Sequence, residues 1–281
     1  MRSIALRLSL FAALAALLLT GCPGPGCPTL PHTDPMRALR MHRSLRRTVT
    51  ALRGEARVDQ RGESGRVRGT VLLFLDRPDR VRFDAMTQFG PAAVLTSDGE
   101  RFQLLDHREN RFLEGEACRS NIARLLGIHM SGAEVAHFLL GDTPRLEAED
   151  VSLACSSEGY LVVRTAADGR RQEIVLTARE ADEEAPPEEQ HLRLRRSELF
   201  DAAGKTIWRA TFEDYRVVVD PRDEEGRGVA LPFVLRFEDP QREADTLVRF
   251  KEMSIVTEPV APEVFEQTAP PGMSVETISC D

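Results

Sequence analysis

The sequence lacks the features of a nucleic-acid binder, a metal protein or a protein with membrane-spanning helices. Acidic residues outnumber basic ones, 45 to 37, for a net charge of −8, whereas nucleic-acid binders normally show a basic excess. The six histidines are scattered, and His129 and His137 are too far apart to share a metal on one helix face. Beyond the N-terminal run, no stretch is long and apolar enough to span a bilayer. We therefore expect no nucleic-acid partner, no metal and no transmembrane helix.

Catalytic motifs are missing as well. Gly204-Lys205-Thr206 looks like the end of a phosphate-binding loop, but Leu199 stands where that motif needs its first glycine. Gly62-Glu63-Ser64-Gly65 does not have the spacing of a nucleophile elbow. Paired acidic residues lie in expected turns or in one acidic loop, where solvation explains them. We expect neither an enzyme nor a cofactor.

The N-terminus has the layout of an export signal. Arg2 and Arg7 precede an apolar run through Leu19, which is too short and wrongly flanked for a transmembrane helix. Leu19-Thr20-Gly21-Cys22 resembles the bacterial lipobox, in which a signal peptidase cuts before the cysteine and the thiol receives lipid. An ordinary export signal with a chance cysteine is the alternative. We expect residues 1–21 to be a signal peptide and Cys22 to be lipidated.

Lipidation would make the mature chain membrane-anchored, because several acyl chains hold a protein stably in a bilayer. Pro23 follows Cys22, in place of the Asp that keeps many bacterial lipoproteins in the inner membrane. By resemblance to that sorting rule, we expect the outer membrane of a bacterial envelope, with the chain facing the periplasm. Removal of residues 1–21, which hold two arginines and no acids, leaves 35 basic against 45 acidic residues.

Four further cysteines remain after lipidation: Cys27, Cys118, Cys155 and Cys280. An oxidising envelope permits disulfides, and four cysteines allow three connectivities. We predict a Cys118–Cys155 bond, because Cys27 and Cys280 lie in segments that look flexible. Free buried thiols are the alternative.

Changes in periodicity divide the chain. Residues 22–35 are rich in Pro and Gly and predict an extended tether from the lipid. A helix follows, with Asp34 as N-cap and Pro35 in its first turn. One side of it carries five arginines, which predict a solvated face, or one attracted to anionic headgroups: Arg37, Arg40, Arg43, Arg46 and Arg47. From Arg53 the apolar residues alternate, which indicates strands. Two short helices are expected in 119–140, the first ended by Gly127 and the second capped by Ser131 and Glu134.

The strand pattern resumes after residue 140 and continues almost to the C-terminus. Residues 180–190 form an acidic, proline-containing loop that we expect to be solvated and disordered. A dozen or so strands interrupted once by a helical pair predict one curved antiparallel sheet with helices on a face. The prediction is a single domain over residues 36–279. With so few helices as cover, an apolar sheet face could hold a lipid, although a packed core is the more common outcome.

The turn TQFGPA, residues 87–92, places an aromatic residue beside turn punctuation. Gly90 tolerates positive φ and Pro91 fixes its own φ, so the chain reverses there. Turn tips are usually polar. Phe89 is therefore either the last core residue of its strand or an exposed aromatic.

Several stretches, in this order, resemble the LolA/LolB family of lipoprotein carriers and cover residues 36–277. DRPDRVRFDAMTQFGPAAVLTSDGERFQLLD is similar to the central strands, and NIARLLGIHMSGAEVAHFLLGD to the helical segment of the LolB branch. LPFVLRFED and DTLVRFKEMSIV resemble the penultimate strands, and VFEQTAPPGMSVE resembles the C-terminal ending. The match is carried by order and spacing, not by any single motif.

This resemblance implies an unclosed antiparallel β-barrel with a helical lid and an apolar cavity for the acyl chains of a lipoprotein. It implies that Arg77 bonds to the lid and holds it shut; a turn arginine before a proline is the alternative. It also implies that Phe89, in the loop with Gly90 and Pro91, protrudes into the membrane. The candidate cavity lining is Val81, Phe83, Leu95, Phe102, Leu104, Phe233, Leu235, Val248 and Phe250.

The function implied is that of a LolB-like outer-membrane receptor. Such a protein takes acylated lipoproteins from a periplasmic LolA-like carrier and inserts them into the bilayer. The chain departs from the family in its greater length, its acidic loop and its extra cysteines. An envelope lipoprotein that acts as a sensor, a structural protein or a carrier of another lipid is the alternative.

Overall fold

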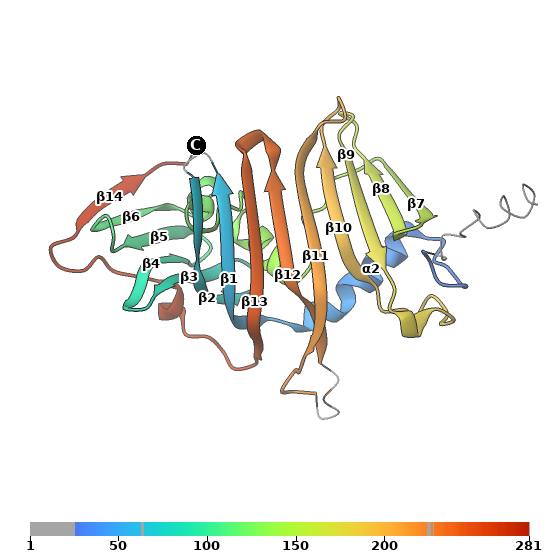
Figure 1. Ribbon diagram of the computed structural model, residues 1–281, viewed down its shortest axis with the longest axis horizontal. Coiled ribbons are helices and arrows are strands. Elements are labelled where there is room, and N and C mark those ends of the chain that lie inside the picture. The colour runs from blue at the N-terminus through green and yellow to red at the C-terminus, as the bar shows by residue number, and fades with distance from the viewer. Residues whose placement is uncertain (1–25, 63–64, 224–225, 227, 281) are drawn as a thin grey trace, which may run out of the picture.

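The computed structural model describes residues 26–62, 65–223, 226 and 228–280, so the expected signal peptide and Cys22 lie outside the described residues. The described chain forms a 14-stranded sheet in the order β14-β6-β5-β4-β3-β2-β1-β13-β12-β11-β10-β9-β8-β7 (Figure 1). The first seven strands are β1 Ala51–Gly62, β2 Gly65–Asp76, β3 Arg80–Thr87, β4 Gly90–Ser97, β5 Arg101–Asp106, β6 Arg111–Glu116 and β7 Asp150–Ser156. The others are β8 Gly159–Thr165, β9 Arg171–Thr177, β10 Arg193–Phe200, β11 Thr206–Val218, β12 Val229–Asp239, β13 Ala244–Val256 and β14 Ser274–Ile278.

The helices are short. They are α2 Pro35–Ser44, α3 Arg119–Leu126 and α4 Gly132–Leu139, with 3₁₀ turns η1 Leu45–Thr48, η2 Glu180–Asp182, η3 Pro240–Arg242 and η4 Pro262–Phe265. Asp34 caps α2 as predicted, because its carboxylate accepts from the Met36 and Arg37 amides at 2.8 and 3.2 Å. The predicted capping box of Ser131 and Glu134 begins α4.

The sheet is open and almost entirely antiparallel. Neighbouring strands pair antiparallel except β14, which pairs parallel with β6. The two ends of the strand order, β14 and β7, are not partners of one another among the described residues. This confirms the predicted unclosed antiparallel sheet. Alternation is the cause: in β3, Val81 and Phe83 are fully buried while Arg80 and Arg82 lie on the other face.

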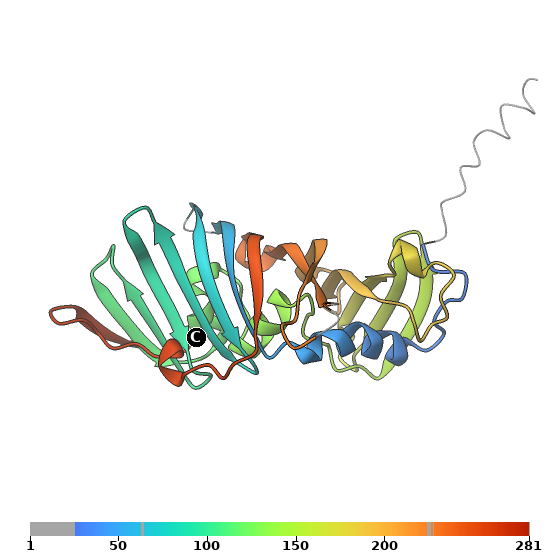
Figure 2. The same ribbon diagram turned by 90° about the horizontal axis from the view of Figure 1, so that it is seen from below.

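One face of the sheet carries the core. Buried residues from the strands and from all three α-helices form one connected cluster, in which Leu39 of α2, Ile122 of α3 and Phe138 of α4 take part. Figure 2 shows α2, in blue, running along strands β8–β10, and α3 and α4, in green, near the middle of the sheet. The helices therefore cover this face along most of the sheet.

The opposite face is partly covered by the segment between β13 and β14. Phe265 of η4 is buried against Phe74 of β2, with ring centroids 5.8 Å apart. The Arg82 guanidinium donates to the Val264 carbonyl at 3.2 Å, and the side-chain Nε2 of Gln267 donates to the Val94 carbonyl at 3.0 Å. The chain then turns into β14 beside β6, so the C-terminal segment crosses the outer face of β2–β5.

The predicted Cys118–Cys155 disulfide is wrong. Cys118 pairs with Cys280, and Cys155 pairs with Cys27, with Cα–Cα distances of 6.1 and 5.8 Å. The two terminal segments are held in place rather than flexible. The parallel pairing of Ile278 with Gly115 brings Cys280 beside Cys118. At the other end, Cys27 is buried and packs into the core cluster.

Two further expectations need correction. From Cys27 onward the expected tether packs on the protein: His32 is buried, and its amide donates to the Tyr160 hydroxyl at 3.1 Å. The acidic loop 180–190 is ordered. Asp182 is buried and accepts from Arg179 and from the His191 amide, while Gln190 accepts from the Tyr160 hydroxyl at 2.8 Å. These buried hydrogen bonds offset the conformational entropy lost when residues 180–190 are held in one conformation.

Candidate functional site

The β3–β4 hairpin presents Phe89 to solvent. The side chain is 91% exposed, so it is not the last core residue of its strand. Thr87 pairs with Gly90, and the Thr87 hydroxyl donates to the Gly90 carbonyl at 2.8 Å while accepting from the Phe89 amide at 3.2 Å. Gly90 has φ of 122°, which other residues rarely adopt. The local hydrogen bonds thus fix a tight turn whose tip is aromatic, and the role of this tip in membrane contact stays a prediction.

The start of β2 lies beside this hairpin. Thr70 pairs with Met86, so Val67 of β2 lies at about the height of Phe89. Val67 is 59% exposed, and Arg66 and Arg68 flank it, both paired with Asp59. Two exposed apolar side chains and neighbouring arginines therefore mark one end of the sheet. This combination suits an interface between apolar and anionic surroundings.

The nine residues predicted to line a cavity all lie on the face that the helices cover. They are no more than 7% exposed. Phe233 and Phe250 pack edge to face, with centroids 6.4 Å apart, and Phe138 of α4 packs against Phe212 and Phe237 at 5.4 and 6.1 Å. The nine residues share one face of the sheet, and their side chains belong to a packed core. Their binding of acyl chains stays a prediction.

Arg77 contacts the helical segment that follows α2. Its guanidinium donates to the Arg46 carbonyl of η1 at 3.2 Å, and its amide donates to the Thr50 carbonyl at 2.8 Å. Burial lowers the pKa of Arg77, with the charges of Arg47 and Arg43 acting in the same direction and that of Asp142 opposing them. The resemblance placed a lid contact at Arg77. The contact is to η1, and its role as a latch stays a prediction.

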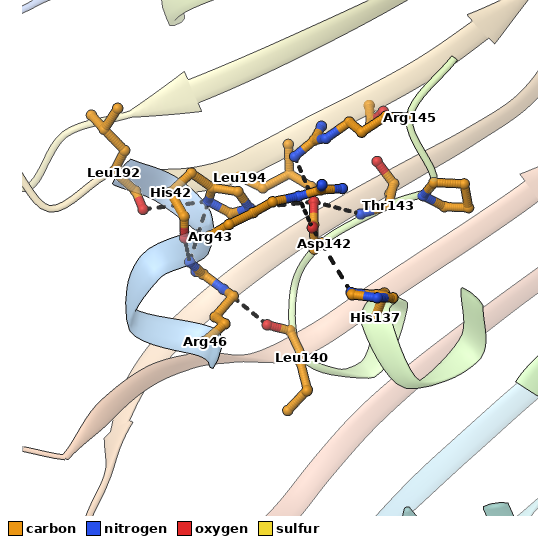
Figure 3. Close-up of polar contacts among 12 residues, drawn as sticks. His42, Arg43, Arg46, His137, Leu140, Asp142, Thr143, Arg145, Leu192 and Leu194 are labelled. Atoms are coloured by element: carbon orange, nitrogen blue, oxygen red, sulfur yellow. Dashed lines mark hydrogen bonds and ion pairs between the residues drawn. The ribbon is translucent and has the colours of Figure 1, made fainter. Parts of the chain in front are cut away.

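A buried polar network joins α2 to the turn after α4 (Figure 3). Asp142 is buried and accepts from Arg43 Nε at 2.6 Å and from Arg145 Nη2 at 2.5 Å. Arg46, only 5% exposed, donates to the Leu140 carbonyl at 2.9 Å. The predicted solvated face of that helix is therefore wrong for Arg46, whereas Arg43 stays partly exposed while it pairs with Asp142.

His42 is the neutral member of this network. His42 Nδ1 lies 3.2 Å from Arg46 Nη1, which can only donate, and 3.4 Å from the Leu192 carbonyl, which can only accept. Nε2 faces Asp142 Oδ1 at 3.6 Å, beyond hydrogen-bond distance. Burial, reinforced by the charge of Arg46, lowers the pKa of His42 to about 4. His42 is therefore uncharged at neutral pH.

Asp142 keeps its charge. Burial would raise the pKa of its carboxyl, but the charge of Arg145, the contact with His42 and the charge of Arg43 outweigh it and hold that pKa well below its usual range. Sequence reasoning missed this residue: Arg145 is a local partner three positions on, but Arg43 is 99 positions away along the chain. The network can hold two segments together; it contains no nucleophile beside a base.

Other functional groups do not gather in the described part of the chain. No group of three or more His, Cys, Asp or Glu residues there could hold a metal ion. None of the helices formed by the described residues has the length and apolar character to cross a membrane. The candidate functional site is therefore the helix-covered sheet face together with the Phe89 hairpin.

Comparison with known proteins gives a likeness of fold. No protein-family model and no curated protein matches the chain. Among solved structures, the chain is similar to a LolA superfamily protein from Nitrosomonas europaea, with 10% identity over 84% of this chain and 99% of the other, at a TM-score of 0.49. A domain from Vibrio parahaemolyticus named for outer membrane lipoprotein sorting shares 11% identity over 82% and 97%, at a TM-score of 0.48.

A DUF1329 family protein from Desulfovibrio piger is similar as well, with 13% identity over 83% of this chain and 98% of the other, at a TM-score of 0.48. The open, mostly antiparallel sheet with few helices rests on the strand pairing of this chain itself. The residues and geometry of this chain carry the functional argument.

Proposed function

We propose that this chain is a lipoprotein anchored through Cys22 in the outer membrane, facing the periplasm. It binds the acyl chains of other lipoproteins on its apolar sheet face and helps to insert them into the bilayer. The donor is a periplasmic LolA-like carrier. The observation that carries the proposal is Phe89, an aromatic side chain 91% exposed at the tip of a tight hairpin.

An exposed phenylalanine gains free energy by entering a bilayer. Burying such a side chain contributes roughly 1.5–3 kcal/mol. That is too little to hold a free protein on a membrane, but an acyl anchor supplies the rest. The hairpin would therefore perturb the bilayer locally without having to bind it alone. Arg66 and Arg68 at the same end of the sheet lie close enough to meet anionic headgroups.

Acyl chains would enter between the sheet and the helices. The aliphatic and aromatic side chains of this face are chemically suited to them, and each buried methylene contributes about 0.8 kcal/mol. Entry requires α3 and α4 to separate from the strands, because their side chains now fill that space. Arg77 and the Asp142 network, which hold η1 and the turn after α4, would resist this movement.

The packed core favours a second candidate. A sensor, a structural envelope lipoprotein or a carrier of another lipid could have the same fold with an interior that never opens to lipoprotein acyl chains. The nine predicted lining residues, all no more than 7% exposed, fit a filled interior. The two functions differ in one property, the transfer of acylated cargo.

The test is delivery by a Phe89→Glu variant. We expect folding and cargo binding to be retained, because the side chain is in solvent and makes no core contact. Delivery of a fluorescent triacylated lipopeptide from the protein into liposomes should fall by about tenfold or more, since burying a carboxylate in the bilayer is costly. Stopped-flow fluorescence measures the rate.

The matched control is Val219→Glu. Val219 is 57% exposed and directly follows β11. It lies at the end of the sheet where β1 and β3 begin, and Phe89 lies at the opposite end, where β3 ends. This variant should deliver at the wild-type rate. Unchanged delivery by Phe89→Glu would reduce the residue to an exposed turn, and an equal loss in both variants would show a general charge effect.

A further inference from the structure

An arginine-rich pocket opens at the end of the sheet opposite Phe89. It has a volume of about 1080 Å³ and lies between η1, the start of β10 and the facing ends of β11 and β12. Its lining includes five arginines: Arg46, Arg47, Arg179, Arg193 and Arg222. We call it the arginine pocket. Figure 1 shows the α2–η1 segment passing the lower ends of β11 and β12, which brings these elements together.

Two of the five arginines are neutralised by neighbours. Arg179 pairs with Asp182 at 2.7 Å, and Arg222 pairs with Asp220 at 2.8 Å. Arg222 also donates to the Thr48 carbonyl at 2.7 Å, which joins the β11–β12 connection to η1. These pairs hold the walls of the pocket in place and contribute little net charge.

The other three have no carboxylate partner among the described residues. Arg46 donates to carbonyls, including Leu140 O at 2.9 Å, and it is itself buried. Arg47 is exposed at the rim. Arg193 makes no ion pair, and its Nε is buried without a hydrogen-bond partner. A buried N–H group without a partner costs free energy, so a missing acceptor is indicated at this position.

Tyr215 brings two of these arginines together. The guanidinium of Arg46 lies 5.8 Å from the centroid of its ring and that of Arg193 lies 5.4 Å from it. The Tyr215 hydroxyl donates to the Leu194 carbonyl at 2.6 Å, which fixes the ring. Burial lowers the pKa of Arg193, and the positive charges of Arg179 and Arg46 lower it further. The charge of Asp182 opposes this shift without outweighing it, so like charges are held near one another with only partial compensation.

The charge of the pocket contrasts with that of the chain. Among the described residues of the lining, the arginines outnumber the acids Asp220 and Asp223, within a protein of net charge −8. A concave site with low-dielectric walls concentrates the field of such charges and attracts anions. The lining also includes Leu192 and Val229, both part of the core. The site therefore combines a cationic rim with apolar walls.

From this arrangement we propose that Arg46, Arg47 and Arg193 bind a phosphoryl group in the arginine pocket. Guanidinium groups match phosphate oxygens in geometry and bind them through charge-assisted hydrogen bonds. The volume far exceeds a phosphate ion, so the phosphoryl group would belong to an anionic lipid headgroup whose apolar part contacts Leu192 and Val229. The proposal is independent of delivery by Phe89, which lies at the other end of the sheet.

The experiment is calorimetric titration of the non-acylated mature chain with dihexanoyl phosphatidic acid below its micelle concentration. Inorganic phosphate and zwitterionic dihexanoyl phosphatidylcholine are the parallel probes. We expect saturable binding of phosphatidic acid, weaker binding of phosphate and no binding of phosphatidylcholine. Arg47→Gln combined with Arg193→Gln should weaken phosphatidic acid at least tenfold, and Arg108→Gln, a change in the exposed β5–β6 turn, should leave it unchanged.

The single Arg47→Gln variant keeps the test valid if the double variant does not fold, because Arg47 is exposed. It should weaken phosphatidic acid by several-fold with an unaltered melting temperature. Equal affinity for phosphate and phosphatidic acid would support phosphoryl recognition and identify free phosphate as the source. Absence of saturable binding, or affinity unchanged by both variants, would overturn the proposal while leaving lipopeptide delivery untouched.

Discussion

At the scale of single residues, burial decides what each polar group does. His42 and Asp142 belong to one network, yet the first is neutral and the second charged at neutral pH. His42 faces Arg46 and Arg145, whose charges oppose a proton on the ring. Asp142 faces the same kind of charge, which stabilises its anion. The network therefore makes stability depend on pH.

The expected dependence follows from the lowered pKa of His42. The unfolded imidazole takes up its proton near pH 6.5, and the folded one near pH 4. Between these values the unfolded state binds more protons, so the free energy of unfolding falls as the pH falls through this window. We expect a loss of roughly 2 kcal/mol between pH 6.5 and pH 5 from this residue. Urea unfolding at several pH values measures it.

His42→Leu is the matching variant. His32, His129 and His137 also have pKa values lowered mainly by burial, and they add to the slope in the same direction. The variant retains their share and should lose only that of His42, giving a flatter profile. A slope identical to wild type would show that His42 takes no part in the acid loss.

Prediction at this scale succeeded where the signal is local. Gly90-Pro91 predicted the turn, and the sequence left two positions for Phe89, of which the exposed one is found. Asp142 was missed, because its burial depends on α2, from which Arg43 and His42 reach it across about a hundred positions of sequence. The nearby Arg145 alone does not reveal that burial. Arg46 was expected in solvent for the same reason: helical spacing places it beside other arginines and does not reveal the Leu140 carbonyl.

At the scale of elements, caps and boundaries were predictable and chain-end packing was not. Asp34, Ser131 and Gly127 mark helix ends by short-range hydrogen bonds or by backbone conformation. The disulfides depend instead on where β14 and residues 27–32 pack. A five-residue strand rich in polar residues gives no sequence signal for parallel pairing with β6. Most of the strands and the three described α-helices were predicted, but β14 and the long-range partners of the chain ends were not.

Cys280→Ser tests the role of the C-terminal disulfide. β14 is a short edge strand, and the Cys118–Cys280 bond closes a separation of 162 residues. Without it, we expect β14 to separate from β6 and the free energy of unfolding to fall by about 2–4 kcal/mol. Hydrogen exchange at residues 274–278 and urea unfolding measure the two effects.

Cys27→Ser is the comparison for that variant. It removes the bond to Cys155 and should expose residues 27–32 and β7 while leaving exchange at β14 unchanged. Protection of residues 274–278 that persists in Cys280→Ser would show that strand pairing alone holds the C-terminal segment.

At the scale of the whole molecule, alternation along the strands predicted one curved antiparallel sheet, and the short helical run predicted helices on one of its faces. That the sheet is not closed was implied only by the family resemblance. Whether the interior is filled depends on side-chain packing between segments far apart, such as Phe138 against Phe212 and Phe237. Sequence pattern contains no such information. The helices are packed on the sheet and leave its apolar face covered, and the proposed function requires them to separate from it.

The most direct measurement of that claim is mass spectrometry of the non-acylated mature chain purified from cells. If the proposed function holds, the sheet face that the helices cover binds cargo in the cell, and some of that cargo stays bound during purification. We predict that acylated lipoproteins or lipids co-purify with the chain and are released by organic solvent. The amount of bound lipid should fall when the helices are held on the sheet. A clean protein that also fails to crosslink to a carrier or to lipoproteins would contradict the account.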